Sequence, residues 1–189
     1  MKIKKEKGTI TLEACVTLIM FTFLMLFWSG LMIIYTAQGD MSHTLLETAE
    51  SMSLDPYAIE RLNTTGANIE SELGTYISQL VTKVFGNNSS NPYFATDKKW
   101  YKSTDSESLP DVAKKRFIGY FSNGDENKAE DILKYFNVVN GLSGLDFSES
   151  KVENGDLYLT IKYELEYEYN IYSLLKIPVK QTIKVKLFK

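Results

Sequence analysis

The chain has few of the side chains from which catalytic and metal sites are built. Its 189 residues include one cysteine, Cys15, and one histidine, His43. A single cysteine excludes an internal disulfide, so the fold must depend on packing. The usual zinc constellations are excluded, as is any Cys–His or Ser–His nucleophile arrangement not built around His43. Phosphate-loop, nucleophile-elbow and metal-ligand motifs are missing too, so we expect a non-catalytic protein without cofactor, metal or small-molecule substrate.

Charged residues are missing from one long stretch, residues 14–39. The apolar part, Ala14–Ala37, supplies 24 residues, and a bilayer core needs about 20 in a helix. Its Thr and Ser hydroxyls are expected to bond back to the preceding helical turn. A cleaved signal peptide is a poorer interpretation, because its apolar region has about 7–15 residues and ends at a small-x-small site.

The charges on either side of this stretch predict its orientation. Residues 1–8 carry a net charge of +3, whereas residues 40–189 carry −5. This positive-inside asymmetry predicts a single-pass protein of the cell membrane, with a cytoplasmic N-terminus and an extracytoplasmic C-terminal domain. An acidic exterior also argues against a nucleic-acid partner, which requires a clustered basic face.

A carboxylate opens the apolar stretch. Glu13 follows Gly8 in the sequence K-G-T-I-T-L-E-A, and a charge beside a membrane span is a functional hypothesis by default. Gly8 has no side chain, so the backbone can enter a protease cleft there, and we expect it to interrupt the helix. The simpler alternative is that Gly8 only punctuates the sequence and that Glu13 is an interfacial charge.

This pattern resembles the class III signal of type IV prepilins. More closely, KGTITLEACVTLIM…LLETAESMS, from about Lys7 to Met52, is similar to the TadE-like family, the minor pilins or pseudopilins of the bacterial tight-adherence (type IVc) pilus system. A weaker similarity lies in the C-terminal YLTIKYELEYEY…KIPVKQTIKVKLF. Ala14 departs from the aromatic residue usual in the major pilins, and the chain is longer than theirs, so the resemblance implies a minor component.

The resemblance also implies how the chain is processed and assembled. A prepilin peptidase would cut after Gly8, leaving Thr9 as the new N-terminus and Glu13 as its fifth residue. Glu13 would then pair with the α-amine of a neighbouring subunit. The implied partners are the lipid bilayer, the peptidase, other pilins or pseudopilins, and the proteins of the pilus assembly platform.

The helix is expected to continue beyond the membrane. Met41, Leu45, Ala49 and Met52 keep an apolar stripe at helical spacing. A helix from Thr9 to about Leu54 would be about 70 Å long at 1.5 Å per residue, half in lipid and half a stalk. His43 on this stalk is expected to be a solvated or packing residue. Asp55-Pro56 then predicts a break, with Asp55 as the N-cap of a new helix.

The exterior part combines helices and strands. Apolar periodicity predicts a helix over residues 69–85 and shorter helices at about 110–121 and 125–136. Trp100-Tyr101 is expected to dock on the core. From Leu145 the period changes to two, and Asn154-Gly155 predicts a hairpin turn. The tyrosines of this strand suit either a binding face or a half-buried strand, and they are Tyr158, Tyr163, Tyr167 and Tyr169.

The last two strands are expected to form an antiparallel hairpin, connected by Asn170–Pro178. Odd-numbered apolar residues face inward in both strands, and acidic and basic residues face outward. A slip of one residue would place lysines in the core, so the register should be strongly specified. The predicted cross-strand pairs are Glu168 with Lys180, Glu164 with Lys184, Lys162 with Lys186, Leu165 with Ile183, and Tyr163 with Val185.

These expectations combine into an α+β, pilin-like protein. Residues 1–8 form a prepilin-type leader, residues 9–54 a transmembrane helix and stalk with 14–37 in the membrane, and residues 55–189 an extracytoplasmic head. The expected function is that of a non-catalytic minor pilin or pseudopilin of a type IV pilus or secretion apparatus. The alternative is an unprocessed single-pass surface protein whose exterior domain binds a ligand.

Overall fold

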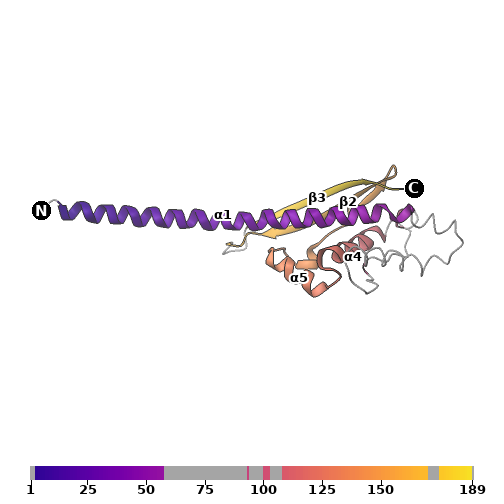
Figure 1. The fold of residues 1–189 in the computed structure, drawn as a ribbon, viewed down its shortest axis with the longest axis horizontal. Coiled ribbons are helices and arrows are strands. Elements are labelled where there is room, and N and C mark those ends of the chain that lie inside the picture. The colour runs from indigo at the N-terminus through magenta and orange to yellow at the C-terminus, as the bar shows by residue number, and fades with distance from the viewer. Residues whose placement is uncertain (1–2, 58–92, 94–99, 103–107, 170–174, 189) are drawn as a thin grey trace.

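The computed structural model describes residues 3–57, 93, 100–102, 108–169 and 175–188. One long helix, α1, runs through the molecule, and the other elements lie along its C-terminal half (Figure 1). The sheet is antiparallel, which confirms the predicted α+β class. In chain order the elements are α1 (Ile3–Ser53), α4 (Leu109–Ser122), α5 (Glu126–Tyr135), the 3-10 helix η2 (Gly141–Gly144), β1 (Lys151–Glu153), β2 (Asp156–Glu166) and β3 (Lys176–Lys186).

Helix α1 is continuous over 51 residues, because this stretch contains no proline. At 1.5 Å per residue it is about 76 Å long. The prediction that Gly8 interrupts the helix is wrong, since Gly8 lies inside α1. A single glycine lowers helix stability by only about 1 kcal/mol relative to alanine, and the residues on both sides offset that cost.

The polar residues of α1 behave as the sequence predicts. The hydroxyls of Thr17 and Thr22 donate to the carbonyls of the preceding turn, at 2.9 and 2.8 Å. The helix ends at Ser53, Leu54 forms a turn, and residues 55–57 are helical again. The predicted break is therefore confirmed, but Asp55, which was predicted as the N-cap, is itself helical.

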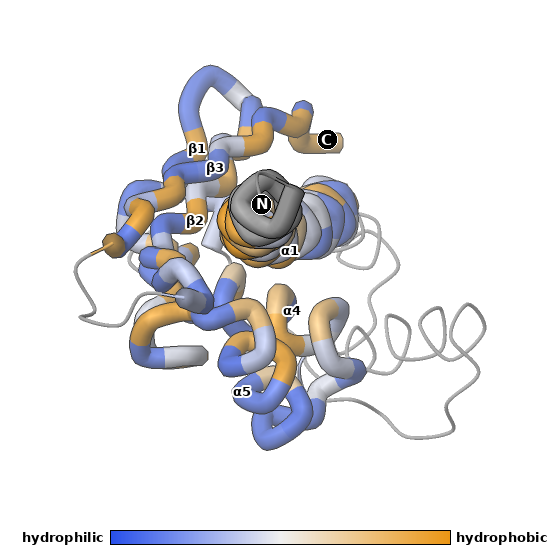
Figure 2. The backbone as a smooth tube through the Cα atoms, turned by 90° about the vertical axis from the view of Figure 1, so that its left-hand side faces the viewer, coloured by the Kyte–Doolittle hydropathy of each residue, from blue (hydrophilic) through white to orange (hydrophobic). Residues whose placement is uncertain are grey.

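The apolar stripe of α1 lies in the core of the head. Met41, Leu45, Ala49 and Met52 are fully buried, and the covered face extends back through Ala37 to Ile34. Figure 2, viewed from the N-terminal end, shows the sheet on one side of α1 with α4 and α5 below it. The part of α1 that was predicted to be a stalk therefore packs into the core of the head. An apolar stripe outside lipid must be covered by protein, and here the head covers it.

The sheet has the strand order β1-β2-β3 and packs its apolar face against α1. Asn154 and Gly155 have φ angles of 55° and 83°, as a two-residue hairpin turn requires, so the predicted turn is confirmed. The inward face of β2 is buried, also as predicted, and consists of Leu157, Leu159, Ile161, Tyr163 and Leu165.

The pairing of β2 with β3 is antiparallel, as predicted, but its register is wrong by six residues. Glu164 lies opposite Pro178 instead of Lys184, and Tyr163 lies opposite Val179 instead of Val185. Because the shift is an even number, every side chain keeps its predicted face. The error came from treating Pro178 as part of the connection, whereas proline is tolerated in an edge strand such as β3.

Helices α4 and α5 confirm the two predicted short helices. Asp125 caps α5, and its side chain accepts hydrogen bonds from the backbone N–H groups of Asn127 and Lys128. Trp100 is fully buried in the core, as predicted. The helix expected over residues 69–85 lies outside the described residues.

Candidate functional site

The residues with a predicted role in processing and assembly lie at the N-terminal end of α1. Gly8 and Thr9 are within the helix, and Glu13 follows one turn later on an exposed surface. All residues from Thr11 to Ser29 are exposed, and most are apolar. By length and composition, α1 could cross a membrane once. The segment Thr11–Ser29, the bare segment, is thus an exposed and mostly apolar part of α1 with one carboxylate, Glu13, near its start.

The head contacts the C-terminal end of the bare segment through a pair of aromatic rings. The Tyr167 hydroxyl donates a hydrogen bond of 3.0 Å to the Phe27 carbonyl, and the two ring centroids are 6.1 Å apart. A Cβ on Gly30 would lie 2.6 Å from the Tyr167 ring, so the ring fits there only because residue 30 is glycine. Further along the helix, the Gln181 amide donates to the Gln38 carbonyl at 3.1 Å.

A buried ion pair holds the other end of α1. Arg116 of α4 donates to Asp55 at 2.9 Å, and their side chains are 1% and 2% exposed. The indole N–H of Trp100 donates to the second oxygen of Asp55, also at 2.9 Å. Ser51 lies 3.4 Å from the same guanidinium nitrogen. This Asp55–Arg116–Trp100 cluster joins the end of α1 to α4 and to the segment around Trp100.

Sequence reasoning missed this cluster, although it contained a signal. Asp55 was expected only to cap a helix, and Arg116 received no role. Arg116 stands at helical spacing from the buried Val112 and Ala113, on the face of α4 that packs into the core. A lone arginine on an apolar helical face predicts a buried carboxylate partner, because a buried charge must be paired.

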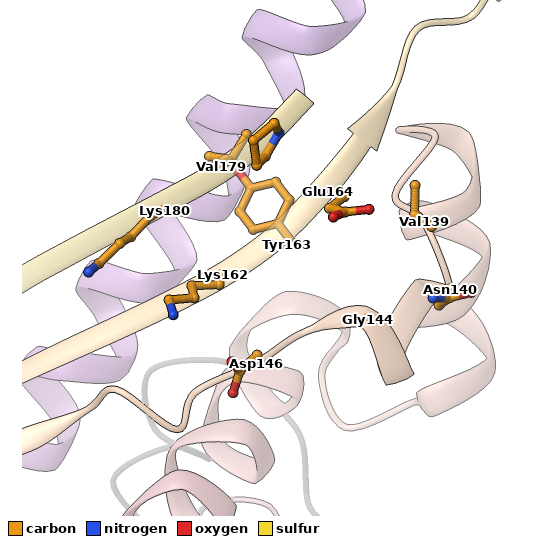
Figure 3. Close-up of a pocket in the computed structure, with 10 residues that line it drawn as sticks. Val139, Asn140, Gly144, Asp146, Lys162, Tyr163, Glu164, Val179 and Lys180 are labelled. Atoms are coloured by element: carbon orange, nitrogen blue, oxygen red, sulfur yellow. The ribbon is translucent and has the colours of Figure 1, made fainter. Parts of the chain in front are cut away.

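A shallow hollow of about 430 Å³ lies between the β2–β3 hairpin and the segment from Val139 to Asp146. In Figure 3, Lys162 and Lys180 point the same way from neighbouring strands, whereas Glu164 points toward Val139. Lys162 and Lys180 are opposite each other in the sheet, and both bind Glu149. The carboxylate between them offsets the repulsion of the like-charged pair.

The pKa values in this region have structural causes. Hydrogen bonds from Lys162 and Lys180 lower the pKa of Glu149, and hydrogen bonds from Ser148 lower that of Asp146. Burial raises the pKa of Tyr163, which lies in the apolar face of β2. These shifts move the pKa values of the three groups further from pH 7, so they do not prepare a general acid or base for use near that pH.

The remaining candidate residues have structural surroundings. His43 is solvated, with its side chain 3.8 Å from Glu47, which confirms the expectation of a solvated residue. The strand tyrosines form no single surface, because Tyr163 is buried, Tyr167 packs on α1, and Tyr158 lies between Lys151 and Lys184. Among the described residues, no group of three His, Cys, Asp or Glu side chains could hold a metal ion.

Comparison with known proteins gave no match to a family model, a curated protein or a solved structure. The described part of the chain combines a bare apolar helix carrying Glu13, a head fixed to the rest of the same helix, and a shallow hollow lined by paired charges.

Proposed function

We propose that the chain is a membrane-anchored minor pilin or pseudopilin, a non-catalytic structural component of a type IV, Tad-like pilus or secretion apparatus. One observation supports the proposal: Gly8 and Glu13 stand near the start of a helix whose segment Thr11–Ser29 is exposed and mostly apolar. The head covers only the second half of that helix. Such a subunit is anchored in the bilayer with its N-terminus cytoplasmic and its head outside.

Glu13 is the assembly residue in this proposal. After cleavage behind Gly8, it would lie in the first turn of the helix, where free N–H groups favour a negative charge by about 0.3–1 kcal/mol. Its carboxylate is exposed on the bare segment, so a neighbouring helix can reach it. Pairing with the α-amine of a neighbour's Thr9 would remove the cost of an unpaired charge in lipid and set the axial register.

Gly8 is the cleavage residue, and its position within α1 adds a requirement. A peptidase binds an extended chain, so the turns around Gly8 must unwind before cleavage. Glycine lowers the cost of unwinding by about 1 kcal/mol relative to alanine, and helix termini fray readily. Gly8 lies within the first two turns of α1, far along the helix from Phe27 and Gly30, where the head contacts it.

Coexpression with a prepilin peptidase tests the processing step. We expect removal of residues 1–8 and a new N-terminus at Thr9, measured by N-terminal sequencing of the membrane-extracted protein. Gly8→Asp should block cleavage but leave membrane insertion intact. Gly39→Asp is the matched control, because Gly39 lies in the same helix with open space around it, and its product should be cleaved normally.

The contrary result is clear. If Met1 is retained while the same peptidase cuts a control prepilin, the chain is not a pilin-type subunit. That outcome would favour an unprocessed single-pass surface protein. No arrangement of side chains among the described residues favours a ligand-binding role for the head, since the lysines of its shallow hollow are already bound to Glu149.

A further inference from the structure

We propose that the hairpin end of the head, formed by Tyr167, Tyr169 and Leu175, rests on the outer lipid interface beside Trp28, so that the membrane span is Thr9–Trp28. This inference rests on the proposed membrane anchoring of α1. It adds the bilayer surface as a binding partner of the head, and it moves the span toward the N-terminus from residues 14–37.

The head attaches to α1 near Trp28. Tyr167 follows directly after β2, and its ring lies over Gly30 with its hydroxyl bound to the Phe27 carbonyl. Figure 1 shows the end of β2 and the start of β3 beside the middle of α1, at the border of its bare half. The head therefore covers one face of α1 from Gly30 onward, so lipid cannot surround the helix on all sides there.

Two charged residues beside the hairpin end also limit the position of the membrane boundary. Glu168 and Lys176 flank the hairpin end, and both are exposed. If residues 14–37 spanned the bilayer, Phe27 would lie near its centre, and these two charges would lie at the same depth. Ionised side chains facing hydrocarbon are costly and rare. Placing the outer boundary at Trp28 keeps both charges on the aqueous side.

The length of the helix segment from Thr9 to Trp28 agrees with the thickness of a bilayer. Twenty residues from Thr9 to Trp28 span about 30 Å, which matches the hydrocarbon core of a bilayer. The exposed apolar segment Thr11–Ser29 covers nearly the same range. The span would then start at the residue that becomes the N-terminus after the proposed cleavage.

The exposed side chains at this level of the molecule are of the kinds that favour a membrane interface. Trp28 is 57% exposed, Tyr169 42% and Leu175 61%. No charged residue occurs between Glu168 and Lys176. Tryptophan and tyrosine favour the membrane–water interface, where an apolar ring and a polar group are both satisfied. In a span of 14–37, by contrast, Trp28 would lie near the middle of the bilayer.

This placement has a consequence for Glu13. Glu13 would lie about 6 Å inside the inner hydrocarbon boundary, four residues beyond Thr9. An isolated carboxylate at that depth is unfavourable. The place where the head attaches to α1 would therefore set the depth of Glu13 in the lipid. At that depth, pairing with an amine would lower the free energy of the carboxylate more than it would in water.

The depth of Trp28 tests the boundary. The full, uncleaved chain is placed in phosphatidylcholine vesicles that contain lipids with a doxyl quencher at a shallow or a deep position. Trp28 should lie about 15 Å from the bilayer centre if the span is Thr9–Trp28, but within about 4 Å of it if the span is 14–37. The difference between wild type and Trp28→Phe isolates this signal, because the only other tryptophan, Trp100, is buried in the head.

A second probe tests the hairpin end. In a Cys15→Ser background, Leu175→Cys carries an environment-sensitive fluorophore, and Glu153→Cys is the control at the opposite end of β2. We expect stronger quenching of Trp28 by the shallow lipid, and a blue-shifted, quenchable probe at residue 175 but not at residue 153.

Stronger quenching of Trp28 by the deep lipid would overturn the proposed boundary. A probe at residue 175 that is as hydrated as the one at 153 would overturn the lipid contact of the hairpin end. Absence of all quenching would overturn both, together with the membrane anchoring. Failure of the pilin proposal is separate: it appears as retained Met1, and the depth of Trp28 would not change with it.

Discussion

Removing the guanidinium of Arg116 should destabilise the head more than any surface substitution. Arg116 and Asp55 form an ion pair of 2.9 Å with side chains 1% and 2% exposed. In Arg116→Ala, the Asp55 carboxylate stays buried with the Trp100 indole as its remaining bond from this cluster. Breaking a buried pair from one side costs about 3–5 kcal/mol, a large share of a domain stability of about 5–15 kcal/mol.

The assay is urea unfolding of the full chain in detergent micelles. A Trp28→Phe background leaves Trp100, which touches Asp55, as the only tryptophan and thus as a local reporter. Lys134→Ala is the control, because Lys134 forms an exposed pair of 3.9 Å with Glu130, and such helix pairs contribute about 0.3–0.5 kcal/mol.

A double-mutant cycle separates the ion pair from simple loss of packing. Asp55→Asn keeps an acceptor for Trp100 but removes the charge, so it should destabilise the head while Arg116 is present. Arg116→Met is made alone and combined with Asp55→Asn; the double variant leaves no unpaired buried charge, so it should be destabilised by less than the sum of the two single variants. If Arg116→Ala costs no more than Lys134→Ala, or if the two sites are additive, the ion pair does not hold α1 to α4.

Two further predictions concern α1. Glu13→Ala should insert into the membrane and be cleaved normally but fail to co-purify with pilus components, because it lacks the carboxylate that pairs with a neighbour's amine; normal co-purification would leave Glu13 an interfacial charge. Gly30→Ala should be less stable than its control Gly39→Ala in the same urea assay. Both gain up to about 1 kcal/mol of helix propensity, but only at Gly30 does the new Cβ lie 2.6 Å from the Tyr167 ring, displacing a hydrogen bond that contributes about 0.5–1.5 kcal/mol. Equal midpoints for the two variants would mean that Tyr167 does not depend on Gly30.

Local patterns were sufficient for the elements that depend on neighbours in the chain. The apolar periodicity of α1, the two short helices, the Asn154-Gly155 turn and the alternation of β2 and β3 were all predicted correctly. In each case, the preference of a few adjacent residues agrees with the side that must be buried. The back-bonding of Thr17 and Thr22 follows from the same local geometry.

The register of the hairpin could not be predicted in this way. Alternation fixes which face each side chain takes, but it is identical after a shift of any even number of residues. The charge pairs used to choose among these registers contribute only about 0.2–1 kcal/mol each. The observed register instead places the Tyr167 ring over Gly30 and Lys162 beside Lys180, with Glu149 binding both lysines.

The candidate site divides in the same manner. The sequence alone is sufficient for the features that lie within one segment: the apolar helix, the basic N-terminal residues, and the spacing of Gly8 and Glu13. It was also sufficient for the α+β class and for the face that each strand residue takes. Each of these depends on residues close together in the chain, whose spacing is visible in the sequence.

The place where the head meets α1 depends on contacts between segments that lie far apart in the chain. Tyr167 and Phe27 are 140 residues apart in the chain, and Asp55 and Arg116 are 61 residues apart. Local periodicity relates only residues that are close together in the chain, so it could not predict these contacts. Such contacts depend on the shapes of whole elements once they are packed, and many pairings satisfy the same apolar pattern. The same packing buries Met41, Leu45, Ala49 and Met52 in the core and leaves the segment Thr11–Ser29 exposed.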